Sequence, residues 1–161
     1  MAKQIRVYGQ SQKWTALGIV AAYLESHPNA TLSDLQKAFP KNEIGNEIDT
    51  VDNIVSKEKN GAFDEKLAKQ ITDMEMYLTL KDETKVAFSN PMWPSENFKK
   101  MEKCAERYGI EIAEYKEAEK GIGKRGNYRL EVVSEEKKSK WLLWVILIII
   151  VLGIVAYFAL R

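Results

Sequence analysis

Hydrophobic residues at the start of the chain predict a short strand followed by an amphipathic helix. Apolar and polar residues alternate over residues 4–8, which is typical of a β-strand. Ser11 is a suitable N-cap for a helix that continues to Ser26, where the His-Pro-Asn sequence that follows would end it. The helical spacing places on one face the apolar side chains of Trp14, Leu17, Ala21 and Leu24.

A second, shorter helix is predicted over residues 31–39. Thr31 and Asp34 have the spacing of a capping box in its acidic form, and Pro40 closes the helix. The side chains that face inward are those of Leu32, Leu35 and Phe39. Because a tight turn joins this helix to the first one, the pair has a helix-turn-helix outline.

The middle of the chain predicts a third helix and then a β-hairpin. Apolar residues recur at helical spacing at Ile44, Ile48, Val51 and Val55. Residues 77–80 and 85–88 are both rich in strand-forming residues, and the polar sequence KDET separates them. The two runs therefore predict a hairpin.

The last part of the hydrophilic region predicts one more helix and two more strands. Ser95 is a suitable N-cap, and Gly109 stands where a glycine commonly follows a helix end. The buried face of this helix is formed by Phe98, Met101, Ala105 and Tyr108. Residues 111–113 and 128–133 have strand-like composition.

Residues 141–160 form an apolar run of 20 positions without one ionisable group. A helix of that length spans about 30 Å, the thickness of the hydrocarbon core of a bilayer. A buried core helix is the alternative, but a domain of this size has too small a core to surround it. Trp141, Trp144 and Tyr157 lie near the ends of the run, where interfacial aromatic residues collect. The run predicts a single transmembrane helix.

The charged residues beside this run predict its orientation. Lys137, Lys138 and Lys140 precede it, and Arg161 alone follows it. The positive-inside rule keeps the lysine side in the cytoplasm. The N-terminal residues are too polar for a signal peptide. We therefore expect a tail-anchored, single-pass protein of the cytoplasmic membrane, with its N-terminal domain in the cytoplasm.

The charges of the hydrophilic region are balanced overall but uneven near the apolar run. Residues 1–140 contain 23 basic and 23 acidic side chains, which is unusual for a nucleic-acid-binding domain. Residues 120–140 contain seven basic and three acidic side chains, which favours contact with anionic headgroups. Lys124, Arg125 and Arg129 are the candidate headgroup or phosphate contacts, although the glycine-rich loop at 121–126 lacks the P-loop pattern.

The sequence contains no recognisable catalytic centre, metal site or cofactor motif. His27 is the one histidine and Cys104 the one cysteine, so neither a zinc site nor a disulfide framework can be assembled. We expect His27 to be a surface turn residue and Cys104 to be a small buried residue. These observations favour a protein that is not an enzyme.

Polar residues on two predicted helices are candidate contacts for a partner or for DNA. They are Gln36, Lys37, Lys99, Lys100 and Lys103. Acidic residues on the same helices offset the lysines, so DNA binding is conceivable but not favoured. A protein partner fits a neutral domain better.

Three stretches of the chain carry a resemblance to a known module: YLESHPNATLSDLQKAFP, the hairpin sequence YLTL-KDET-KVAFSN, and the W-x3-N-F helix that ends at YGIEI. Together they resemble a small accessory module of bacterial proteins, especially those of the Bacteroidetes. The resemblance covers roughly residues 13–114. The module has no activity attached to it, so the resemblance implies a bacterial source and an interaction domain, and it implies no catalytic residue.

The order helix, helix, helix, hairpin favours a winged-helix-like α+β domain. We expect a cytosolic domain at residues 1–133, a basic juxtamembrane linker at 134–140 and a transmembrane helix at 141–160. The expected function is the recruitment or regulation of a protein partner at the membrane, by a chain that forms homo-oligomers. One alternative is a membrane-bound helix-turn-helix regulator that binds DNA. Another is a toxin or defence effector that oligomerises through its span and disrupts the membrane.

Replacing Ile149 with lysine tests the predicted span. A lysine at the centre of a transmembrane helix costs roughly 2.5–3.5 kcal/mol, so the membrane-inserted fraction should fall, and any toxicity should fall with it. Alkaline extraction of membranes, with Ile149→Ala as the control, measures this fraction. Equal extraction of the two variants would contradict the predicted span.

Overall fold

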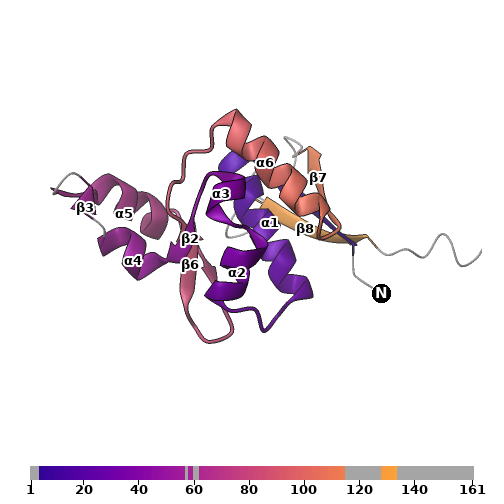
Figure 1. Ribbon diagram of the computed structural model, residues 1–161, viewed down its shortest axis with the longest axis horizontal. Coiled ribbons are helices and arrows are strands. Elements are labelled where there is room, and N and C mark those ends of the chain that lie inside the picture. The colour runs from indigo at the N-terminus through magenta and orange to yellow at the C-terminus, as the bar shows by residue number, and fades with distance from the viewer. Residues whose placement is uncertain (1–3, 57, 60–61, 115–127, 134–161) are drawn as a thin grey trace, which may run out of the picture.

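The computed structural model describes residues 4–56, 58–59, 62–114 and 128–133, which form an α+β domain (Figure 1). The α+β class expected from the sequence is confirmed. The helices are α1 (Gln12–Ser26), α2 (Leu32–Ala38), α3 (Lys41–Ile44), α4 (Val51–Ser56), α5 (Glu65–Asp73) and α6 (Ser95–Glu106). The strands are β1 (Gln4–Gly9), β2 (Ile48–Thr50), β3 (Glu58–Lys59), β4 (Ala62–Phe63), β5 (Leu78–Thr79), β6 (Lys85–Phe88), β7 (Ile110–Glu114) and β8 (Tyr128–Val133).

The first sheet joins the beginning of the chain to the end of the described region. β1 lies in the middle, parallel to β7 and antiparallel to β8. Ile5 and Val7 point into the core, whereas Arg6 and Tyr8 lie on the outer face. There Arg6 pairs with Glu111 at 2.8 Å, and the Tyr8 hydroxyl donates to Glu131 at 2.6 Å. One face of this sheet is therefore apolar, and the other is covered by paired polar groups.

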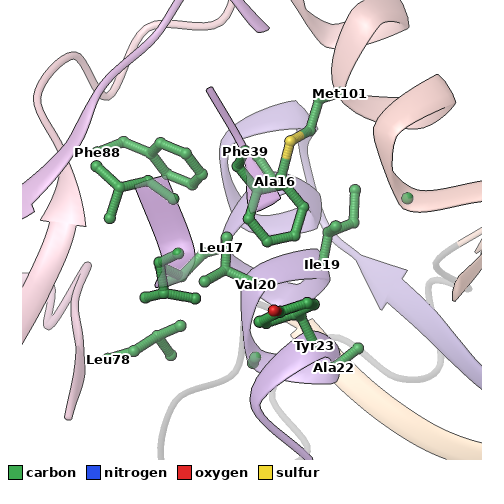
Figure 2. Close-up of a cluster of buried hydrophobic side chains, with 14 of the residues drawn as sticks. Ala16, Leu17, Ile19, Val20, Ala22, Tyr23, Phe39, Leu78, Phe88 and Met101 are labelled. Atoms are coloured by element: carbon green, nitrogen blue, oxygen red, sulfur yellow. The ribbon is translucent and has the colours of Figure 1, made fainter. Parts of the chain in front are cut away.

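Helix α1 is buried around its whole circumference, so the prediction of a single buried face is wrong. Ten consecutive residues, from Trp14 to Tyr23, are buried. The first sheet covers one side of α1, while side chains from α2, α6 and the second sheet lie against others (Figure 2). A Cβ atom at Gly18 would lie 2.6 Å from Val7 Cγ1, so the close contact between α1 and β1 requires glycine there.

The expected third helix over residues 44–55 is replaced by a short helix, a strand and another helix. Helix α3 ends at Ile44 because Gly45 adopts a left-handed conformation, with φ of +69°. The chain then forms β2, which pairs with β6 some forty residues later in the sequence. Helix α4 begins directly after β2, where Thr50 Oγ1 accepts the Asn53 amide at 3.1 Å. Pairing with a distant strand overrides the helical spacing of the apolar residues.

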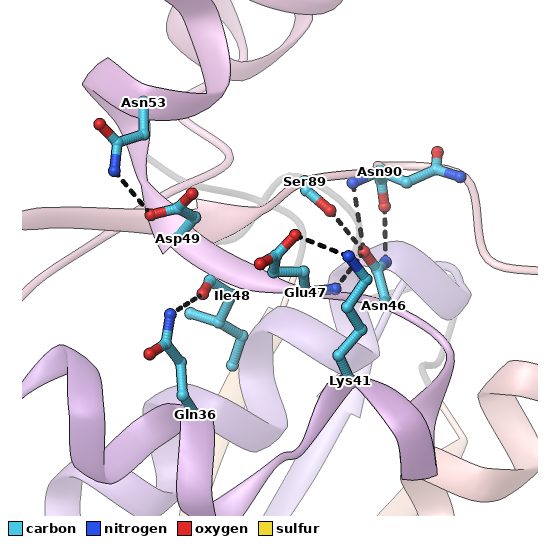
Figure 3. A network of polar contacts seen from close by, with 9 residues as sticks. All are labelled: Gln36, Lys41, Asn46, Glu47, Ile48, Asp49, Asn53, Ser89 and Asn90. Atoms are coloured by element: carbon cyan, nitrogen blue, oxygen red, sulfur yellow. Dashed lines mark hydrogen bonds and ion pairs between the residues drawn. The ribbon is translucent and has the colours of Figure 1, made fainter. Parts of the chain in front are cut away.

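A buried asparagine connects the segment before β2 to the segment after β6 (Figure 3). Asn46 is 4% exposed, and its amide nitrogen donates to the Asn90 carbonyl at 2.7 Å. Its Oδ1 accepts the backbone amides of Glu47 and Asn90 and the Ser89 hydroxyl. At the outer edge of β2, the Gln36 side chain donates a hydrogen bond to the Ile48 carbonyl at 2.9 Å. These bonds fix the second sheet, in which the strand order is β2-β6-β5.

Helices α4 and α5 project from the second sheet and have a small core of their own (Figure 1). This core consists of Val51, Ile54, Ile71 and Ala87, with Leu67 and Tyr77 packed against it. The carboxylate of Asp64 caps α5 by accepting the Leu67 amide at 3.0 Å.

Most of the helices and strands that local sequence signals predict are confirmed. The hairpin is present as β5 and β6, and the predicted last strands are present as β7 and β8. Gly109 follows α6 with a φ of +66°, as expected for a glycine after a helix end. Ser11 occupies the N-cap position of α1 as expected, although its side chain makes no capping bond. The N-cap prediction for α6 needs correction, because Pro94 rather than Ser95 occupies that position.

Among the described residues, no helix is long and apolar enough to cross a bilayer. The predicted linker at 134–140 and the predicted transmembrane helix at 141–160 lie outside the described residues.

The capping box at the start of α2 is confirmed. Asp34 Oδ2 accepts the Thr31 amide at 3.0 Å and the Thr31 hydroxyl at 2.8 Å, and the Thr31 hydroxyl accepts the Asp34 amide. The hydrogen bonds from the Thr31 backbone and side chain lower the pKa of Asp34 below its usual value. Because the folded-state pKa is the lower one, this stabilisation is present above the unfolded-state pKa and is lost as the pH falls through the folded value.

Asn46→Ala is expected to reduce the free energy of unfolding by about 3 kcal/mol, since several partly buried backbone groups lose their partner. Asn97→Ala is the control, because Asn97 donates one longer bond of 3.2 Å to the Gly45 carbonyl. Its expected cost is about 1 kcal/mol or less. Denaturant unfolding monitored by circular dichroism measures both values, and similar costs would contradict the central role of Asn46.

Asp34→Asn is expected to lower the melting temperature at pH 7. The effect should diminish as the pH falls from about 4, the ordinary pKa of an aspartate, through the lower pKa of Asp34 in the folded protein. In a Thr31→Val background the effect at pH 7 should be smaller, because the hydroxyl partner is gone. Thermal unfolding over a pH series checks both statements. A pH-independent difference would show that the charge of Asp34 is not involved.

Candidate functional site

The two ends of helix α1 lie at opposite ends of the domain. Val133 pairs with Gln4 and Ile110 with Ile5, so the end of β8 and the start of β7 lie beside the start of β1 (Figure 1, right). A two-residue connection reverses the chain after β1, so the C-terminal end of α1 also lies there. The N-terminal end of α1 lies about 22 Å away, given 15 residues at 1.5 Å rise each.

A groove of about 580 Å³ lies at the N-terminal end of α1, away from the end of β8. Three segments that are distant in sequence form it: residues 11–13 at the start of α1, Gln70 on α5, and residues 91–94 before α6. The Trp93 side chain is 8% exposed and packs edge-on against Phe88, with ring centroids 4.8 Å apart. Trp93 therefore anchors the groove to the second sheet.

Met92 is the most exposed large apolar side chain of the described residues, at 73%. It stands between Trp93 and Pro91, and the side chain of Asn90 accepts its backbone amide at 2.9 Å. Met74, which is 44% exposed, directly follows α5 as its C-cap residue and does not line the groove. The exposed Met92 at the groove is an adaptable apolar side chain of the kind used to bind other proteins.

The 91–94 segment is held in place by its neighbours in sequence and in space. Asn90 is bonded to the buried Asn46 through its backbone amide and its carbonyl. Pro94 has a φ of −58° and leads directly into α6. A segment fixed at both ends presents Met92 with little conformational freedom, which reduces the entropy lost on binding.

The described residues contain no group of three His, Cys, Asp or Glu side chains that could hold a metal ion. Cys104 is fully buried, its thiol contacts the Ala38 carbonyl at 3.4 Å, and burial raises the pKa of that thiol. Arg107 donates to Cys104 Sγ at 2.6 Å and also pairs with Glu43. A buried thiol of raised pKa is a poor nucleophile. The burial of Cys104 agrees with the expectation that it is a small buried residue.

Two of the candidate contacts on α2 have different environments. Gln36 is bonded to β2 through the Ile48 carbonyl, so it stabilises the fold and is not a free contact residue. Lys37 is exposed and lines a pocket with Tyr23 and Tyr108 at the C-terminal end of α1.

Lys99, Lys100 and Lys103 are exposed on α6, as expected. Lys100 pairs with Glu96 at 3.2 Å, one turn earlier on the helix. None of the three lines the groove or the pocket that contains Lys37. The candidate contacts on α2 and α6 therefore do not form one site.

Arg129 belongs to the outer face of the first sheet. Its guanidinium lies 4.1 Å from the centroid of the Tyr8 ring, and one nitrogen lies 3.9 Å from Glu131. The other candidate membrane contacts lie outside the described residues: Lys124, Arg125, Lys137, Lys138, Lys140, Trp141, Trp144 and Tyr157.

The groove is the feature that the sequence interpretation missed. Its signal is the segment PMWP, in which two prolines flank two large apolar residues. Nothing local in this segment distinguishes a buried Trp93 from an exposed Met92.

No family model, curated protein or solved structure matches this chain. The resemblance to a bacterial accessory module therefore stays a prediction.

Proposed function

We propose that this protein is a tail-anchored membrane protein that recruits or regulates a protein partner through the groove beside Met92. The observation that carries the proposal is the exposed Met92, fixed beside the buried Trp93. The partner would insert an apolar side chain into the groove between Met92 and the start of α1. The described residues provide shape and apolar contact but no grouped catalytic side chains.

The position of the groove suits a membrane-anchored domain. In the proposed arrangement, the seven linker residues 134–140 separate the end of β8 from the apolar run. Seven residues span at most about 25 Å when fully extended. The end of β8 would therefore face the membrane, and the groove, about one α1 length away, would face the cytoplasm. A partner could reach the groove without contacting the bilayer.

The finer fold that we propose is winged-helix-like, although with a different assignment of its helices. In such domains a strand precedes two helices and a hairpin, and that strand pairs with the last strand. Here β2 precedes α4 and α5, the hairpin β5–β6 follows, and β2 lies beside β6. The helix before the hairpin is then α5, in place of the third helix expected over residues 44–55.

The DNA-binding alternative has weaker support in this assignment. Helix α5 would face the major groove, and its Lys69 already pairs with Glu65 at 2.6 Å. DNA binding should weaken steeply with added salt, which distinguishes it from apolar docking. The toxin alternative requires the span itself, so its effect should be lost when an unrelated span replaces residues 141–160, whereas recruitment should survive.

Met92→Ser is expected to weaken partner binding by roughly tenfold or more, since burying a methionine side chain contributes about 1.5–3 kcal/mol. Val132→Ser is the matched control, because Val132 is 56% exposed at the other end of the domain. The measurement is affinity purification of the full-length protein from detergent-solubilised membranes. The yield of co-purifying protein is compared between the two variants.

A protein partner that is lost with Met92→Ser and kept with Val132→Ser would support the proposal. Equal recovery with both variants would remove the groove as the docking site. Nucleic acid that salt releases, with no protein partner, would favour the DNA-binding regulator.

A further inference from the structure

A second concave site lies at the opposite end of α1 from the groove. It has a volume of about 540 Å³, within the range of small-molecule sites. Its walls include the rings of Tyr23, His27 and Tyr108 and the charged side chains of Asp34 and Lys37. We propose that this pocket binds a zwitterion, with its ammonium group against the aromatic rings and Asp34 and its anionic group paired with Lys37.

The aromatic wall is held in a fixed arrangement before any ligand binds. The rings of Tyr23 and His27 stack with centroids 4.1 Å apart, and Tyr108 meets Tyr23 edge-on at 4.9 Å. The Tyr108 hydroxyl donates to the Ala38 carbonyl at 3.2 Å, and His27 Nδ1 lies 3.0 Å from the Tyr23 carbonyl. A cation beside the negative face of such rings is attracted by their quadrupoles.

Two further features make this side of the pocket favourable for a positive charge. Helix α1 ends here with no basic residue in its last turn, so the partial negative charge at its C-terminus is not offset within the helix. Both bonds that Thr31 donates to Asp34 go to Oδ2, so Oδ1 accepts no hydrogen bond from the described part of the chain. Burial raises the pKa of Tyr23 and Tyr108, which keeps both rings uncharged.

Lys37 explains why the ligand should carry both charges. A simple cation would be repelled by the Lys37 ammonium group, and a simple anion by Asp34. The two residues are three positions apart on α2, so their Cβ atoms are about 5–6 Å apart. A molecule with an ammonium group and a phosphate or carboxylate separated by a short carbon chain matches this pair of opposite charges.

The location of the pocket suggests where such a molecule would come from. Tyr108 lies two residues before β7. The start of β7 and the end of β8 both lie beside the start of β1, so the pocket is at the end of the domain where β8 ends. One source is the zwitterionic headgroup of a membrane lipid, and this source rests on the proposed membrane anchor. The other source is a free zwitterion in solution, which needs no anchor.

The probe is O-phosphoethanolamine, titrated into the full-length protein in detergent and followed by ligand-observed NMR. Ethanolamine and inorganic phosphate are titrated separately, because each carries one of the two charged groups of the probe. We expect saturable binding of the zwitterion that is tighter than that of either half. Absence of saturable binding, or equal binding of ethanolamine alone, would overturn the proposal.

Variants test the assigned contacts. Asp34→Asn and Lys37→Met should each weaken binding by roughly tenfold, the effect of one charge-assisted contact in a partly desolvated site. Asp64→Asn is the matched control, since Asp64 also caps a helix but lies on α5, away from the pocket. Tyr108→Leu should weaken binding similarly, and Tyr108→Phe should keep most of it. Equal affinity in Asp34→Asn and Asp64→Asn would overturn the proposal.

Lipid nanodiscs distinguish the two sources. If headgroups occupy the pocket, O-phosphoethanolamine should bind the protein in phosphatidylglycerol nanodiscs and lose that binding in phosphatidylethanolamine nanodiscs. Equal binding in both would assign the pocket to a free zwitterion. Failure of the chain to enter nanodiscs would contradict the membrane anchor alone, because binding in detergent tests the pocket separately.

Discussion

The burial of α1 on every side is the constraint on which the rest of the domain depends. A helix whose residues from Trp14 to Tyr23 are all buried cannot be stable until several other segments enclose it. The first sheet, α6 and the second sheet pack around this helix, and they come from the two ends and the middle of the described sequence. The contact is close because Gly18 allows Val7 to approach the helix. Folding of the domain is therefore expected to be cooperative.

The hydrogen bonds of the buried Asn46 are the second feature on which the structure depends. An apolar core is tolerant of small shifts, whereas a set of hydrogen bonds to one buried amide fixes a register. The bonds from Asn46 join the segments on either side of the second sheet, and the chain leaves this connection directly into residues 91–94. The hydrogen bonds between Asn46 and Asn90 therefore help to position the segment in which Met92 is exposed.

The two concave sites differ in chemistry, and α1 separates them. The groove at its N-terminal end offers apolar side chains and few unpaired charges, which suits a protein surface. The pocket at its C-terminal end combines aromatic rings with one carboxylate and one ammonium group, which suits a small polar ligand. In the proposed orientation, the first site faces the cytoplasm and the second faces the membrane.

The sequence alone determined the elements whose signals lie within a few residues of one another. These are the capping box at Thr31 and Asp34, the hairpin around KDET and the glycine after α6. The apolar run at 141–160 is a local signal of the same kind, and the anchor that it indicates stays a prediction. Tertiary structure decided what depends on distant segments: β2 replaced a predicted helix because β6 pairs with it, and α1 is buried on all sides because both sheets and α6 surround it. The two concave sites could not be predicted from the sequence for the same reason. Only folding brings the ring of Tyr23 against that of Tyr108 and places Gln70 and Met92 in one groove. Periodicity reports which residues share a face, whereas only packing decides what that face contacts.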